Sequence, residues 1–155
     1  MKKNAIIGLL AIVLVFGVLI VGCEEENKDP PPVTKITING ITGKTGLASI
    51  MLYSSFTAVS EPVAGGQGTI SGNSLNEIPM QTAGGGGWNG QSAGGSYMIF
   101  IVFSDESYYA YTGGTSLSDL GITSENDLNT KLPKVPVGLG SVLNFSNFKD
   151  LAEIE

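Results

Sequence analysis

The amino-acid sequence predicts an all-β domain, an antiparallel sandwich of about seven strands that is immunoglobulin-like or a small barrel. From Val33 onward the chain consists of short runs rich in Ile, Val, Thr, Tyr and Phe, separated by clusters of Gly, Asn, Ser and Pro. These runs follow one another at the spacing of hairpins. One run, Ser96 to Ser104, is apolar on both faces, so it must lie between two covering layers.

The chain begins with a pattern typical of an export signal. Lys2 and Lys3 precede an uncharged apolar run from Ala5 to Val21, which is followed by Gly22 and Cys23. Signal peptidases require a positive start, an apolar middle and small residues before the cut, which would fall here between Gly22 and Cys23. The apolar run is slightly longer than a usual signal core, so an uncleaved membrane-anchoring helix is the alternative.

Ile20, Val21, Gly22 and Cys23 resemble the lipobox of bacterial lipoproteins, which is an aliphatic residue, a small or aliphatic residue, Gly or Ala, and then Cys. The resemblance implies that residues 1–22 form a type II signal peptide. It also implies that Cys23 receives a diacylglycerol on its sulfur and a further acyl chain, such as palmitate, on the new amino terminus. The protein would then be exported and anchored to the bacterial membrane, at the outer membrane or the cell surface.

Residues 23–32 are expected to be the acylated cysteine and a tether. Glu24 to Pro32 contains no apolar side chain except proline, so it cannot contribute to a packed core. Residues 33–155 are long enough for one domain, which we expect to be a single β-sandwich.

Composition limits the function of this domain. After cleavage six Lys stand against 14 acidic residues, a net charge of −8, and the chain has no Arg. Because nucleic-acid binding relies on Lys and Arg, we expect no nucleic-acid partner. The chain has no His, and its single Cys is the predicted acyl acceptor. It therefore lacks the commonest general base, a thiol nucleophile and the commonest metal ligands, and we expect a non-enzyme without cofactor or metal.

Four strands are expected in the first half of the domain. Thr34 to Ile38 alternates between apolar and polar residues, as a half-buried strand does. Leu47 to Ser55 is apolar on both faces and is expected to be central. Gly68 to Ser71 and Ser74 to Met80 flank a Gly-Asn pair, which predicts a hairpin, and Pro79 places its second strand near an edge.

Three strands are expected in the second half. Ser96 to Ser104 needs an opposing sheet on one face and a loop, a helix or a partner on the other. Asp105-Glu106 then predicts a tight turn into a hairpin partner, Ser107 to Thr112. Thr115 to Gly140 is expected to be mostly loop, and Ser141 to Phe145 supplies the last strand.

Several short motifs of the domain are similar to those of a known group of proteins. They are Ile38-Asn39-Gly40-Ile41, Met51-Leu52-Tyr53, Gly68-Thr69-Ile70-Ser71-Gly72, and Trp88-Asn89-Gly90 ahead of Gly95-Ser96-Tyr97. They resemble the small β-domains of uncharacterised lipoproteins of spirochaetes. The resemblance implies a fold class and brings no activity with it.

Four aromatic residues are candidate ligand contacts. Trp88, the single tryptophan, lies in the glycine-rich stretch Ala83 to Gly95, so its ring either folds back as a core plug or stands exposed as a contact residue. Tyr108, Tyr109 and Tyr111 extend such a surface or are ordinary strand residues. Tyr109 and Tyr111 are expected to share a face of the strand Ser107 to Thr112. The glycine-rich stretch does not predict a phosphate site, because no Lys follows it and the next element is a strand.

The acidic residues do not form a recognisable catalytic or metal-binding motif. Asp105-Glu106 is a turn pair, and Asp119, Glu125 and Asp127 lie in a polar stretch without the spacing of a calcium loop. We expect them to be solvated carboxylates.

Together these observations predict a lipid-anchored envelope protein that binds rather than catalyses, an adhesin-like surface module with a glycan or protein ligand. The alternative is a structural or accessory subunit of an envelope complex, whose two-faced strand Ser96 to Ser104 completes a partner's core. A small lipid or ligand carrier would need an open barrel, for which strands of this length leave little room.

Overall fold

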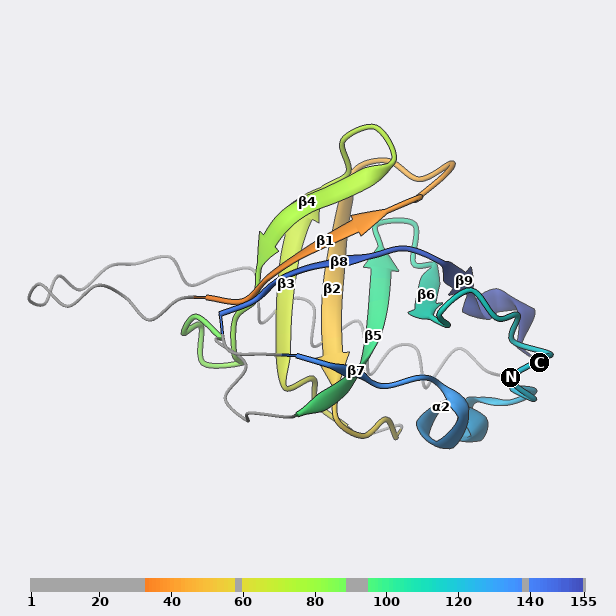
Figure 1. Ribbon diagram of the computed structural model, residues 1–155. Helices are drawn as coiled ribbons and strands as arrows, with labels where there is room; N and C mark the ends of the chain where they lie inside the picture. The colour runs from red at the N-terminus through yellow and green to blue at the C-terminus, as the bar shows by residue number, and fades with distance from the viewer. Residues whose placement is uncertain (1–32, 58–59, 89–94, 138–139, 155) are drawn as a thin grey trace, which may run out of the picture.

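Two β-sheets pack face to face and confirm the predicted all-β sandwich (Figure 1). The computed structural model describes residues 33–57, 60–88, 95–137 and 140–154. The predicted signal peptide, lipobox and tether lie outside these residues.

The smaller sheet has the strand order β4-β1-β8. Its strands are β1 (Lys35–Asn39), β4 (Ser74–Pro79) and β8 (Val142–Phe145). β4 lies at an edge, as Pro79 predicts, and pairs antiparallel with β1. β1 and β8 are parallel, with Lys35 opposite Val142, which differs from the purely antiparallel expectation. A parallel pair needs a long crossover, and here nearly the whole domain lies between the two strands in sequence.

The larger sheet has the order β3-β2-β5-β6-β9, and all its pairs are antiparallel. The strands are β2 (Leu47–Tyr53), β3 (Ala64–Thr69), β5 (Ser96–Phe103), β6 (Tyr108–Tyr111) and β9 (Phe148–Asp150). A short β7 (Val135–Pro136) pairs with the first residues of β5. β2 lies between β3 and β5, as its two apolar faces predict.

The hairpin predicted around the Gly-Asn pair is wrong. Ser71 and Ser74 do form a bridge across the pair, but the strands on either side belong to different sheets. The chain therefore changes sheets at this turn. The strand before the turn spans Ala64–Thr69 instead of the expected Gly68 to Ser71. The sequence did not indicate this strand, because Ala-Gly-Gly-Gln-Gly-Thr has little strand propensity.

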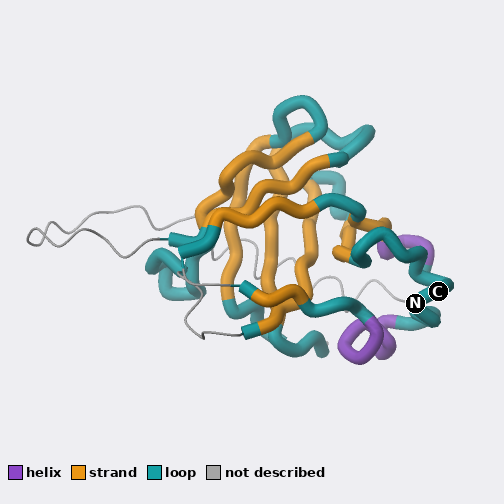
Figure 2. Tube along the Cα trace, viewed as in Figure 1, coloured by secondary structure: helices purple, strands orange, loops and turns teal. Residues whose placement is uncertain are grey.

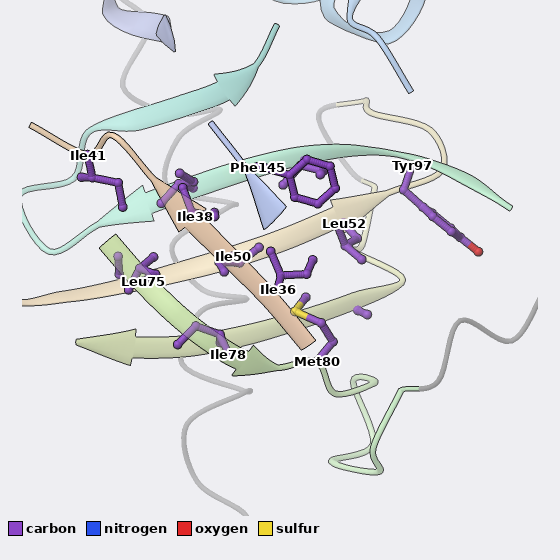
Figure 3. Close-up of a cluster of buried hydrophobic side chains, with 14 of the residues drawn as sticks. Ile36, Ile38, Ile41, Ile50, Leu52, Leu75, Ile78, Met80, Tyr97 and Phe145 are labelled. Atoms are coloured by element: carbon purple, nitrogen blue, oxygen red, sulfur yellow. The ribbon is translucent and has the colours of Figure 1, made fainter. Parts of the chain in front are cut away.

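The main core lies between the two sheets (Figure 3). Ile36 and Ile38 of β1 and Phe145 of β8 face Ile50 and Leu52 of β2. All five side chains are at most 9% exposed.

A second apolar cluster covers the opposite face of the larger sheet. Met98, Phe100 and Val102 of β5 are buried there. The cover comes from the segment after β6, which includes α2 (Glu125–Lys131), and from residues in and beside the 3-10 helix η1 (Leu151–Glu153). Figure 2 shows both helices, in purple, on one side of the sandwich. The chain itself thus supplies the second layer that β5 requires. The covering apolar residues are Leu117, Leu120, Ile122, Leu128, Leu132, Leu151 and Ile154.

Candidate functional site

Of the predicted site residues, the four aromatic ones lie in the described part of the chain. Gly22 and Cys23, the predicted cleavage and acylation site, lie outside it. The lipid anchor therefore rests on the sequence alone.

Trp88 is a core residue, so of the two alternatives the core plug holds and the exposed ligand contact is wrong. Its side chain is 3% exposed, and its ring lies edge to face against Tyr97 with the centroids 5.3 Å apart. The backbone fixes this position, because the Trp88 N–H donates to Met80 and the Thr34 N–H donates to the Trp88 carbonyl, both at 2.8 Å. The ring offers no platform for a sugar.

The three tyrosines of β6 lie on different faces of the larger sheet. Tyr109 and Tyr111 point between the two sheets, as their shared face predicts, and pack against the main core. Tyr108 points to the opposite face and packs in the second cluster. All three are partly exposed. They therefore do not form one contact surface.

Tyr111 belongs to an aromatic corner that we define as Tyr111, Phe145 and Phe148. The Tyr111 ring centroid is 5.3 Å from that of Phe145 and 5.6 Å from that of Phe148, in edge-to-face arrangements. Phe145 is the last residue of β8 and Phe148 the first of β9, so the corner joins the two sheets. Tyr111 and Phe148 remain partly exposed there.

A tight turn between β8 and β9 builds the aromatic corner. Asn147 has a φ of 68°, in the left-handed region that asparagine tolerates better than most residues. Its carbonyl accepts hydrogen bonds from the N–H and the hydroxyl of Thr112, at 3.4 and 3.2 Å. These bonds fix the turn beside the end of β6. Sequence reasoning missed the two phenylalanines, although Phe145-Ser-Asn-Phe148 is an aromatic pair across a turn signal.

Besides the aromatic corner, a cluster of polar and aromatic side chains surrounds Lys44, and the sequence did not suggest it. Its ammonium is 2.7 Å from the Asp105 carboxylate and 2.6 Å from the Ser107 hydroxyl. It also lies over the rings of Phe103 and Tyr109, 5.3 and 5.4 Å from their centroids. The hydrogen bond with Asp105 raises the pKa of Lys44 and so favours its charged form.

The two carboxylates with lowered pKa values have structural partners. The hydrogen bonds from Lys44 and Ser107 lower the pKa of Asp105 to about 2. The ion pair with Lys131 and the bonds from Thr123 and Ser124 lower the pKa of Asp127, which lies in the first turn of α2. In the described ranges, no group of three or more His, Cys, Asp or Glu residues is placed to hold a metal ion.

A shallow hollow lies where α2 meets the end of β2. Its volume is about 180 Å³, below the roughly 300–1,000 Å³ of ligand pockets. The Phe56 N–H donates to the Asn129 side chain across it, at 3.0 Å. The hollow is better described as a packing seam than as a binding pocket. Its lining residues are Phe56, Thr57, Glu125, Asn126 and Asn129.

No family model, curated protein or solved structure matches this chain in the comparisons. The resemblance to spirochaete lipoproteins therefore stays a prediction. In the described part of the chain, no helix is both long and apolar enough to cross a membrane.

Proposed function

We propose that this protein is a lipid-anchored module of the bacterial envelope that binds a partner through its aromatic corner and performs no catalysis. The lipobox pattern ending at Cys23 supports the anchor. The binding role is carried by the aromatic corner, where Tyr111 and Phe148 remain partly exposed at the junction of the sheets.

The pKa shifts of three charged residues favour a non-catalytic role. Catalytic carboxylates and lysines usually have pKa values moved toward neutral pH. In Asp105, Asp127 and Lys44 the shifts go the other way and strengthen the charged forms. These groups are therefore held in their charged forms and are not poised for proton transfer near neutral pH.

The alternative, an accessory subunit whose β5 completes a partner's core, loses its supporting observation. Both faces of β5 are covered within the chain, by the opposing sheet and by the segment that includes α2. The partly exposed aromatic corner is better placed for contact with a partner, because partly apolar aromatic side chains are enriched at protein interfaces.

Two experiments test the two parts of this proposal. For the anchor, Cys23→Ala should leave an unprocessed precursor that takes up no fatty-acid label, and normal processing would refute the anchor.

For the binding site, a photo-crosslinking phenylalanine analogue at position 111 should give a covalent adduct in the producing cells. The matched control at the exposed Gln67, on the opposite edge of the larger sheet, should give none. The absence of any adduct at position 111 would refute the binding site.

A further inference from the structure

Three of the four edge strands, β4, β3 and β9, are protected against further strand pairing. β4 carries Pro79 and a bulge at Glu77, whose φ is 46°. β3 contains three glycines, and Gly65 exchanges backbone hydrogen bonds with Gln81 at 2.9 and 2.8 Å. β9 has three residues and leads directly into η1. Prolines, bulges, coverage and short length all hinder strand addition.

β8 has none of the sequence devices that protect the other edges. Its sequence Val-Leu-Asn-Phe contains no proline, no glycine and no charge, and its pairing with β1 is regular. It lies at the edge of the smaller sheet farthest from β4 (Figure 1). Uncharged, regular edges of this kind are templates for another strand.

The register of β8 shows which of its backbone groups are free. The Lys35 N–H donates to the Ser141 carbonyl at 2.9 Å, so Ser141 and, by the alternation of the parallel ladder, Leu143 and Phe145 face β1. Val142 and Asn144 then direct their backbone N–H and C=O groups away from β1. Within the described ranges, neither has a backbone partner on that side.

The side chains beside this edge suit a protein partner. Val142 is 56% exposed, one of two large apolar residues so exposed in the described ranges, and Asn144 is exposed as well. The strand ends at Phe145, and thus at the aromatic corner. A segment lying along β8 would reach Tyr111 and Phe148 at its end.

We propose that β8 binds an extended peptide segment of a partner protein as an added strand, with Val142 and Asn144 supplying the backbone hydrogen bonds. This inference rests on the proposed binding function and names its mode. An extended backbone presents a donor and an acceptor at every second residue, which matches the free groups of β8. A second copy of this chain suits the edge less well, because a mature net charge of −8 opposes self-association.

The first test uses the mature chain with Cys23→Ser, so that it is not acylated, and a synthetic peptide of the β1 sequence Thr34 to Gly40. This peptide has a sequence that already pairs with β8 in the fold. We expect titration to shift the amide NMR signals of Val142 and Asn144 and to slow their hydrogen exchange. A peptide N-methylated at alternate residues should bind about tenfold more weakly or worse, because it lacks the paired N–H groups. Equal binding of the two peptides, or Val142 and Asn144 amides already protected in the free protein, would overturn the proposal.

The second test uses a pair of variants in the strand. Asn144→Pro removes an N–H that points out of the sheet and should abolish peptide binding, whereas Asn144→Thr keeps the N–H and should bind normally. Binding by a folded Asn144→Pro variant would overturn the proposal. A concentration-dependent dimer, with protection at Val142 and Asn144, would overturn it in favour of a second copy. If the crosslinked adduct at position 111 persists in Asn144→Pro, the binding function stands and strand addition fails.

Discussion

The end of the Ile78 side chain occupies the space in which a side chain at Gly68 would lie. A Cβ atom built on Gly68 overlaps the Cδ1 methyl of Ile78, which reaches across from β4 to β3. The two sheets meet closely at this point because β3 carries no side chain there. This contact explains why position 68 is a glycine.

Gly68→Ala should therefore destabilise the protein by about 1–3 kcal/mol, the usual cost of overpacking a core. Ile78→Val removes the methyl that the new Cβ would meet. In the Ile78→Val background, Gly68→Ala should therefore cost much less stability than it costs in the parent protein. Urea denaturation of the four proteins gives the coupling free energy. Independent, additive effects would contradict the assigned contact.

Gly66→Ala is the matched control. A Cβ at Gly66 would lie 2.6 Å from the carbonyl oxygen of Pro79, which is backbone and cannot move aside as a methyl does. It would also lie 2.8 Å from the Ile78 Cγ2 methyl, and valine at position 78 keeps a γ-methyl. The cost of Gly66→Ala should remain in the Ile78→Val background.

The ion pair between Lys44 and Asp105 should make stability depend on acid pH. Its hydrogen bonds lower the pKa of Asp105 from 3.8 to about 2 in the folded protein. The pair therefore stabilises the fold above about pH 3.8, and this stabilisation is lost as the pH falls through 2. We expect about 0.5–1 kcal/mol, because the Asp105 side chain is 56% exposed and solvent screens the pair.

Thermal denaturation of the parent protein and Asp105→Asn between pH 2 and 6 measures this contribution. The two Tm values should differ at pH 6 and converge near pH 2. A constant difference over this range would show that the carboxylate does not titrate with a lowered pKa.

Trp88 should be shielded from aqueous quenchers. Because its side chain is 3% exposed and it is the single tryptophan of the chain, iodide should quench the intrinsic fluorescence of the folded protein weakly. Unfolding in urea should restore strong quenching. Strong quenching in the folded state would contradict the core position and restore the ring as a candidate contact.

The strands with strong apolar patterns were predictable from the sequence. β1, β2, β5 and β8 lie within one or two residues of their expected bounds, because alternation and β-branched residues determine them locally. The short β7 and β9 were not, since two or three residues carry no periodicity. α2 was missed although Ser124-x-x-Asp127 is a capping signal, because its single buried residue, Leu128, gives no helical repeat.

The candidate site was only partly predictable for a related reason. Tyr109 and Tyr111 share a face in any β-strand, so that part of the prediction is confirmed. Their partners Lys44, Phe145 and Phe148 come from distant parts of the chain and meet only through the order of the strands. Alternation along one strand does not determine which strands lie beside it.

The Tyr108 hydroxyl is buried and has no hydrogen-bond partner in the described part of the structure. An unpaired buried hydroxyl costs about 1–3 kcal/mol of desolvation, so Tyr108→Phe should leave stability unchanged or raise it by about 1 kcal/mol. In Tyr53→Phe the gain should be smaller, because the Tyr53 hydroxyl donates to the Met51 sulfur at 3.6 Å.

Burial also raises the pKa of Tyr108 above its usual 10. Ionisation of the unfolded chain should therefore reduce stability above pH 10, and Tyr108→Phe should weaken that loss. Urea denaturation at pH 7 and pH 10.5 tests both statements, and a clear destabilisation by Tyr108→Phe at pH 7 would show that the hydroxyl has a partner.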